Sequence, residues 1–330
     1  MIPMVVSSFW TNVAWSVPAV RWLWPVQRAK VVGKMTDNIE IDIANLGKTY
    51  RGKKHTIVQA LKGLNIAIRK GEVFGFLGPN GAGKSTTIKI LTGQIKGSEG
   101  SATIQGVPVE DPTSRKKLGY LPENPSFYDF LTAREYLRLV GNAYGMSPNA
   151  ISCSTGEVLA KLELEHAADR PIRGYSKGMV QRLGLAQAML ADPELLILDE
   201  PMSGLDPLGR ALVKDLIKEL KQAGKTIFFS THITADVEIV CDRVGILVGG
   251  ELKALDRVES ILDQGIDGYR LSFAAAEERT IEQLVAVDEL KATLEHILAQ
   301  GGRIERIEPL RRDLERYFLD VVKGTNHEHS

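Results

Sequence analysis

Nine consecutive residues, Gly78–Thr86, constrain this chain more than any other stretch of its 330 residues. They read GPNGAGKST and fit the pattern G-x-x-x-x-G-K-[ST], which forms a loop around phosphate groups. Glycine lets the backbone curl until successive N–H groups point at phosphate oxygens, and Lys84 adds a positive charge for the β- and γ-phosphates. The hydroxyl of Ser85 can ligate Mg²⁺. The candidate nucleotide-binding residues are therefore Gly78, Pro79, Asn80, Gly81, Ala82, Gly83, Lys84, Ser85 and Thr86.

The segments on both sides of this phosphate loop (Gly78–Thr86) support the same interpretation. Val73–Leu77 is a short apolar run that predicts a buried strand, and Thr86–Leu91 predicts the start of a helix. The first turn of a helix carries a partial positive charge, which favours bound phosphate. A glycine-rich loop without this function would rarely combine all three features.

The chain as a whole has no net charge, because 41 Lys and Arg side chains balance 41 Asp and Glu side chains. This balance argues against nucleic acid as a partner, although a local basic patch would be compatible with it. A length of 330 residues allows about two domains. The two cysteines, Cys153 and Cys241, lie too far apart in the sequence for a metal-binding motif, and we expect reduced thiols in a cytosolic protein.

Residues 1–34 differ in composition from the rest and contain all four tryptophans. Tryptophan favours the membrane interface, so one interpretation is a membrane-seeking segment. Prolines and polar residues interrupt the apolar run, however, whereas a spanning helix needs roughly 20 predominantly apolar residues. The basic start of a signal peptide is also lacking. We favour the second interpretation, in which residues 1–34 are an extension outside the fold and Met35 begins the folded chain.

Alternating apolar and polar residues predict two half-exposed strands, Ile39–Ala44 and Leu64–Ile68. Thr132–Glu135 fits a capping box and predicts the start of a helix. Val158–Glu165 predicts another helix, and Val244–Leu255 predicts a hairpin around two glycines.

A second dense cluster begins at Tyr175. The segment Tyr175–Met179 is followed by a strongly helical run, which places Ser176 and Gly178 at a helix N-terminus, another natural site for an anion. Next, Leu195–Leu198 predicts a central parallel strand that delivers Asp199 and Glu200 at its carboxyl end. Asp199 can hold Mg²⁺, and Glu200 can polarise an attacking water. Without the phosphate loop, capping of the next helix would explain this acidic pair equally well.

His232 follows the apolar run Thr226–Ser230, which predicts a third buried strand. A single histidine is more often structural than catalytic. This one follows a strand whose carboxyl end would face the same nucleotide, so we expect it to contact the γ-phosphate.

In this order the motifs resemble those of the ATP-binding subunits of ATP-binding cassette (ABC) transporters, over about Ile39–Leu255. The phosphate loop matches the family's Walker A motif, and Leu195–Glu200 matches Walker B. Tyr175–Met179 stands at the place of the signature motif, and Ser203–Asp206 resembles the D-loop. We call these last two the signature segment and the D-loop segment.

The resemblance assigns further roles and a fold. Tyr50 matches the aromatic residue that stacks on adenine, and His232 matches the switch histidine. The implied fold is an α/β P-loop NTPase with a RecA-like core, an antiparallel β subdomain and an α-helical signature subdomain, to which a small C-terminal α+β appendage is added. The implied cofactors are ATP and Mg²⁺, with Ser85, Asp199 and Glu123 as candidate metal ligands.

Two departures from the family pattern affect these roles. The family usually has L-S-G-G-Q at the signature, whereas this chain has Tyr175, Lys177 and Met179 at three of the five positions. Ser176 and Gly178 are retained and match positions that face the partner's γ-phosphate, so we expect function to survive. Glu123 stands where the family often has Gln; its oxygens can accept, but it cannot donate as an amide does.

The family resemblance also implies partners. Two such domains pack head to tail around two ATP molecules, so one copy of this chain cannot complete a site. We expect a homodimer or, alternatively, a heterodimer with a similar subunit, bound to an integral membrane permease at the cytoplasmic face of the membrane. Both departures resemble subunits that serve ABC-2-type membrane partners, which are commonly exporters. Two alternatives stay open: a soluble ABC ATPase of the DNA-repair or translation type, and a regulatory subunit that hydrolyses ATP weakly.

We expect three parts of the chain: the extension 1–34, an ATPase domain at 35–260 whose helical subdomain covers about 124–191, and an accessory domain at 261–330. In the last part, Glu289–Gln300 predicts a helix, and apolar residues from Leu310 to Val322 fall on one helical face. A small appendage packed on the ATPase is the simpler interpretation, and a regulatory or dimer-contacting domain is the alternative.

Overall fold

The computed structural model describes residues 38–52, 57–263, 266–274, 280–311 and 313–327. The predicted N-terminal extension, residues 1–34, lies outside the described residues.

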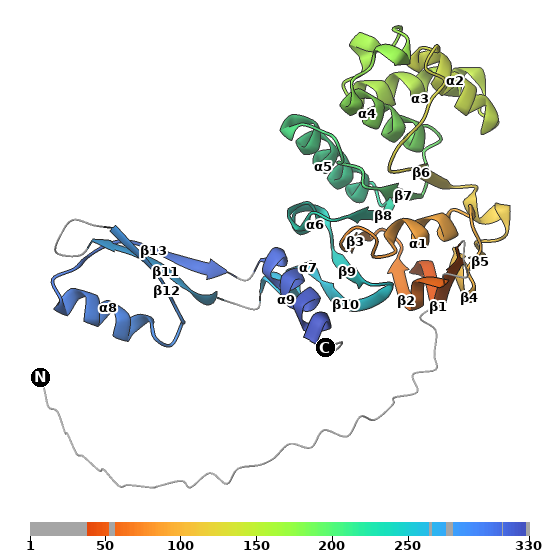
Figure 1. The fold of residues 1–330 in the computed structure, drawn as a ribbon. Coiled ribbons are helices and arrows are strands. Elements are labelled where there is room, and N and C mark those ends of the chain that lie inside the picture. Colours follow the sequence, from red (N-terminus) through yellow and green to blue (C-terminus); the bar gives the residue numbers. More distant parts are fainter. Residues whose placement is uncertain (1–37, 53–56, 264–265, 275–279, 312, 328–330) are drawn as a thin grey trace, which may run out of the picture. The chain divides into compact units, whose positions relative to one another are not determined.

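The site is built on a six-stranded sheet with the strand order β10-β9-β3-β8-β7-β6 (Figure 1). Its strands are β3 (Val73–Leu77), β6 (Leu118–Leu121), β7 (Leu195–Asp199), β8 (Thr226–Thr231), β9 (Arg243–Val248) and β10 (Glu251–Arg257). The strands pair in parallel except β10, which forms the predicted hairpin with β9. Every residue of β3, β7 and β8 is buried, as expected for continuous apolar runs in a parallel sheet. Parallel pairing brings the carboxyl ends of these three strands to one edge.

A second, antiparallel sheet has the order β2-β1-β4-β5. Its strands are β1 (Ile39–Arg51), β2 (Ile57–Arg69), β4 (Glu99–Ile104) and β5 (Val107–Pro108). β1 and β2 extend well beyond the two short strands that the alternation predicted, and several register shifts interrupt their pairing. Each shift breaks the two-residue period, which explains why the sequence pattern revealed only part of each strand.

Helices flank the sheets: α1 (Lys84–Leu91), α2 (Ala133–Ala143), α3 (Pro148–Lys161), α4 (Lys177–Met189), α5 (Pro207–Gln222), α6 (Thr234–Val240) and α7 (Val258–Leu262). Short 3-10 helices lie at Pro112–Arg115, Glu165–Ala167 and Ile172–Gly174. The capping box of α2 is confirmed, since Thr132 and Glu135 exchange both of its hydrogen bonds. The prediction of a helix at Val158–Glu165 was wrong at both ends, because α3 begins at Pro148 after the N-cap Ser147 and ends at Lys161.

Helices α2, α3 and α4 contact one another and form the helical region in Figure 1. Their apolar faces join the core beneath β7, where Leu137, Leu159 and Leu183 are almost completely buried. No described helix is long and apolar enough to cross a lipid bilayer.

The C-terminal part contains a three-stranded antiparallel sheet, order β12-β11-β13, with β11 (Ile266–Ala274), β12 (Thr280–Val285) and β13 (Arg303–Arg311). Helix α8 (Leu290–Ala299) packs on it through Leu290, Leu294 and Ile297. The last helix, α9 (Leu314–His327), contacts α6, α7 and β9, and its Leu314 is fully buried in the same core as residues of α6 and β9. Leu310 was predicted to share the apolar face of this helix, which is wrong, because it lies on strand β13.

Candidate nucleotide-binding site

The phosphate loop joins β3 to α1 by a turn that only glycine can form at two positions. A Cβ atom on Gly78 would lie 2.4 Å from the carbonyl oxygen of Leu247. Gly83 has φ +112°, and a Cβ atom there would lie 2.6 Å from the carbonyl oxygen of Ala60. The loop is therefore seated directly against β9 and β2, and α1 begins at Lys84, two residues before the predicted start.

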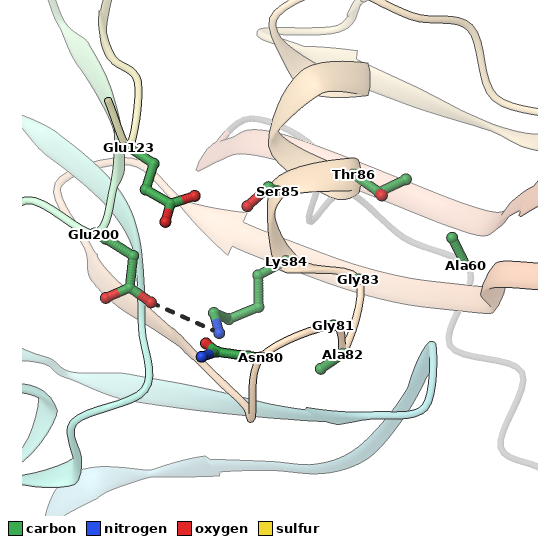
Figure 2. Close-up of a pocket in the computed structure, with 10 residues that line it drawn as sticks. All are labelled: Ala60, Asn80, Gly81, Ala82, Gly83, Lys84, Ser85, Thr86, Glu123 and Glu200. Atoms are coloured by element: carbon green, nitrogen blue, oxygen red, sulfur yellow. Dashed lines mark ion pairs between the residues drawn. The ribbon is translucent and has the colours of Figure 1, made fainter. Parts of the chain in front are cut away.

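This turn forms one wall of a cavity of about 270 Å³ (Figure 2). The opposite wall is made by Glu123, which follows β6, and Glu200, which follows β7. The lining residues are Ala60, Asn80, Gly81, Ala82, Gly83, Lys84, Ser85, Thr86, Glu123 and Glu200. Backbone N–H groups at the start of α1, a lysine and two carboxylates thus face one space, which suits a phosphate chain and a hydrated cation.

Lys84 is 7% exposed, and its ammonium group is held inside the loop. Nζ donates to the carbonyl oxygen of Gly78 at 2.7 Å and lies 3.7 Å from Oε1 of Glu200, the ion pair drawn in Figure 2. Burial lowers the pKa of Lys84 below its usual value, while the carboxylates of Glu200 and Asp199 oppose that shift. A buried cation without a fixed anion at hydrogen-bond distance is well placed to receive phosphate oxygens.

Glu200 occupies a constrained position just past β7. Its backbone has φ +50°, in the left-handed region, and its N–H donates to the hydroxyl of Ser230 at 3.1 Å. The two carboxylate oxygens of Glu200 lie 3.0 and 3.1 Å from Nδ1 of His232. A non-glycine residue in this conformation costs about 1–3 kcal/mol and persists only where the surroundings fix it. The catalytic candidates Glu200 and His232 are therefore brought together, as the sequence led us to expect.

The candidate metal ligands are all oxygen donors, as Mg²⁺ requires. Ser85 and Glu123 line the cavity, and Asp199 is 3% exposed and accepts a hydrogen bond from the hydroxyl of Ser230. Among the described residues, no group of three or more His, Cys, Asp or Glu side chains is arranged to hold a metal ion.

Tyr50 lies at the adjoining end of the antiparallel sheet and is 39% exposed. Tyr50 pairs with Val58 across the β1–β2 ladder, and Val58 is two residues before Ala60, which lines the cavity. Val58 and Ile57 are also exposed, at 54% and 69%. The exposed ring of Tyr50, opposite Val58 at the edge of a phosphate site, offers a flat surface for a base.

Ser176 and Gly178 do not line this cavity; they were predicted to face the nucleotide of a partner subunit, and that remains a prediction. Ser176 is the N-cap of α4 and accepts from the N–H of Met179, so the predicted helix N-terminus is confirmed. Two residues that depart from the family pattern at this segment, Tyr175 and Met179, both contact Arg170. Arg170 lies over the ring of Tyr175, with 5.5 Å between its Cζ and the ring centroid, and donates to the sulfur of Met179 at 3.5 Å.

The sequence analysis did not identify two residues, Gln181 and Ser230, that lie outside the cavity and hold the acidic pair by hydrogen bonds. Gln181, in α4, is 3% exposed and donates to the carbonyl oxygens of Glu200 and Pro201. Ser230 holds both members of the acidic pair. Its position at the end of a strand beside the Walker B strand was a usable signal, whereas nothing in the sequence marked Gln181.

The comparisons with known proteins agree with this geometry. A family model described as ABC transporter matches residues 61–203. The uncharacterized ABC transporter ATP-binding protein sll0415 of Synechocystis is 41% identical over 284 residues, which cover 81% of this chain and 79% of that protein. The linearmycin resistance ATP-binding protein LnrL of Bacillus subtilis is 39% identical over 213 residues, covering 64% of this chain and 67% of that protein.

A solved structure is similar as well. The dimeric post-hydrolysis state of the ATP-binding cassette MJ0796, bound to ADP and Pi, matches with a TM-score of 0.62 and 28% identity, covering 66% of this chain and 98% of that chain.

Proposed function

This chain belongs to the ATP-binding proteins of ABC transporters, and we propose that two copies close around ATP and hydrolyse it to drive export through a separate membrane subunit. The observation that carries the proposal is the grouping of Lys84, Glu200 and His232 at the mouth of the phosphate loop.

Each of these side chains has a distinct task. The ammonium group of Lys84 leaves the loop carbonyls and binds the β- and γ-phosphate oxygens of ATP, which are stronger acceptors because they are charged. Glu200 orients and polarises the attacking water as general base. His232, whose side chain is 49% exposed, holds the Glu200 carboxylate through Nδ1 and contacts the γ-phosphate.

Mg²⁺ would be held by Ser85 and Asp199, with Glu123 as a further candidate. Bound there, the ion would supply positive charge that stabilises the negative charge developing on the phosphates during hydrolysis. The adenine ring would stack on the side chain of Tyr50.

The signature segment supports a sandwich of two copies. Ser176 and Gly178 lie outside the lining of the cavity in their own chain, so they are available to cover the nucleotide of another. The dimeric MJ0796 structure, similar to this chain, supports the same arrangement. ATP then joins the two copies, and hydrolysis removes the γ-phosphate contacts that hold them together.

Exposed aromatic side chains support a docking role for the helical region. Tyr128 and Phe130, which precede α2, are 58% and 67% exposed, with ring centroids 6.0 Å apart. Such a patch is typical of a protein interface. We assign it to the membrane subunit, which would place this chain at the cytoplasmic face as a peripheral protein.

Export is supported by the Bacillus subtilis relative, whose name states linearmycin resistance. We keep the division into residues 35–260 for the ATPase and 261–330 for the accessory part as a proposal, with α9 anchoring the second on the first. The two alternatives from the sequence have no observation in their favour.

The test is steady-state ATP hydrolysis by the purified chain, followed by co-purification from membranes. We expect Mg²⁺-dependent hydrolysis and an integral membrane protein that co-purifies with the chain. A chain with no affinity for Mg-ATP would refute the ATPase proposal, and a chain that hydrolyses ATP but never co-purifies with a membrane protein would refute the transport proposal.

A further inference from the structure

Gln181 is a buried polar side chain whose position the proposed chemistry does not yet explain. It lies in α4, two residues beyond the signature segment, and is 3% exposed. Its Nε2 donates to the carbonyl oxygen of Glu200 at 3.2 Å and to that of Pro201 at 3.3 Å. One amide group therefore holds two successive carbonyls directly behind the proposed general base.

The carbonyl of Glu200 needs such support because the residue is in the left-handed region, with φ +50°. Three elements fix its backbone. Ser230 of β8 accepts from its N–H, the N–H of Ser203 in the D-loop segment donates to its carbonyl at 3.0 Å, and Gln181 of α4 donates to the same carbonyl. A small shift of α4 would therefore change the direction in which the Glu200 carboxylate points.

Helix α4 touches this stretch of backbone a second time, at the signature end. A Cβ atom on Gly204 would lie 2.6 Å from Cε of Lys177, so the lysine stem lies directly over the D-loop glycine. A Cβ atom on Gly178 would lie 3.5 Å from Leu205. The signature end of α4 and the segment from Glu200 to Leu205 are therefore held together at two places, one helical turn apart.

We propose that Gln181 is a positioning residue that links the two nucleotide sites of the sandwich, a proposal that rests on the dimeric ATPase function above. The signature end of α4 faces the partner's nucleotide, while Gln181 fixes the Glu200 that acts on the chain's own nucleotide. Closure of one site thus sets the carboxylate of the other through a single helix.

Packing alone does not account for a glutamine at this position. Burying an amide costs free energy unless its hydrogen bonds are made, and here the amide donates to two carbonyls that an apolar side chain could not reach with a hydrogen bond. The amide supplies what leucine cannot: two donors aimed at two adjacent carbonyls.

The experiment compares the full-length chain with Gln181→Leu, which keeps similar volume and removes both donors. We expect kcat for ATP to fall about tenfold and the Hill coefficient for ATP to fall towards 1, because the coupling is lost. The affinity for ATP, measured by calorimetry, should stay within about twofold, since Gln181 does not line the cavity.

Gln187→Leu is the matched control. Gln187 lies in the same helix and accepts a hydrogen bond from the hydroxyl of Tyr136 at 2.7 Å, away from the acidic pair. It should leave kcat and the Hill coefficient unchanged. Equal losses in both variants would mean that any change in α4 disturbs hydrolysis, and would overturn the proposal.

A second variant, Gln181→Glu, tests the donor role directly. A buried carboxyl group has a raised pKa, and in its protonated form it donates a hydrogen bond. We expect the ratio of variant to wild-type kcat to rise as pH falls. A pH-independent ratio, or wild-type kcat and cooperativity in Gln181→Leu, would overturn the proposal. Failure of the wild-type chain to hydrolyse ATP would instead refute the underlying function.

Discussion

Two helix N-termini in this molecule have similar sequence signals but different surroundings. Helix α1 begins at Lys84, which is 7% exposed and 3.7 Å from Glu200. Helix α4 begins at Lys177, which is exposed, next to Ser176, and neither lines the cavity. The first terminus has its charged neighbours within the same chain, whereas at the second terminus Ser176 and Lys177 are exposed. Under the proposed function, the first terminus belongs to the half of the nucleotide site that a chain provides for itself, and the second to the half that it provides for another copy.

The largest effect should come from Glu200→Gln, which removes the proposed general base from the half of the site that a chain provides for itself. Loss of the general base should reduce kcat about a thousandfold while ATP binding is retained. The variant should also stay dimeric with ATP in size-exclusion chromatography. Glu194→Gln is the matched control, because Glu194 precedes β7 at the opposite end and pairs with Lys117. Normal hydrolysis by Glu200→Gln would show that the base is a different residue.

Lys84→Ala should weaken binding rather than turnover alone. A charge-assisted hydrogen bond is worth about 1.5–3 kcal/mol, so the dissociation constant for ATP should rise about thirtyfold. Calorimetry on the isolated chain measures it directly. Lys89→Ala, an exposed lysine on the same helix, should bind ATP normally. Unchanged affinity in Lys84→Ala would contradict the assignment of the phosphate loop.

Gly178→Ala tests the half that is offered to the partner. A methyl group there would lie 3.5 Å from Leu205, an ordinary contact, so the chain should fold. We expect hydrolysis to fall about tenfold, because the backbone can no longer approach the partner's phosphate closely. ATP affinity of the isolated chain should not change. Gly156→Ala, where a Cβ atom would meet nothing within 4 Å, is the control. Reduced binding by the isolated chain would show that Gly178 serves its own site.

Tyr50→Ala should have the smallest effect. Stacking of a base on an aromatic ring contributes about 1 kcal/mol or more, so KM for ATP should rise about fivefold with little change in kcat. Tyr144→Ala, which removes a tyrosine that is 46% exposed in the helical region, should leave KM unchanged. An equal KM for ATP in wild type and Tyr50→Ala would remove this residue from the site.

Much of the fold could be predicted because its central strands are apolar runs. β3 and β7 are buried on both faces, and their short uninterrupted patterns located them within a residue. The start of α3 was missed although Ser147 and Pro148 form a good N-terminal signal. The residues that follow include serine, threonine and glycine, which form helices poorly, so packing through Ile151 and Val158 decides the outcome.

The candidate site divides in the same way. Lys84 and Glu200 could be placed together because each belongs to a motif that follows the carboxyl end of a predicted buried strand. Gln181 could not, since its role depends on how the backbone of Glu200 turns, which no sequence pattern records. Met179 stands where the family usually has Gln. The structure shows that its sulfur accepts a hydrogen bond from Arg170, a contact that the sequence could not predict.

The position of the last helix has a consequence for how the protein is made. Leu314 is fully buried in the same cluster as Val237 and Val244, and its N–H donates to Oε2 of Glu238 at 3.3 Å. Residue 314 is synthesised after the residues that it packs against, so the apolar surface of α6 stays open to water until α9 has left the ribosome. A nascent chain can therefore contain every nucleotide-binding motif and still lack the helix that covers this surface. A chain that stopped before residue 314 would expose apolar side chains, and cellular quality control would remove it.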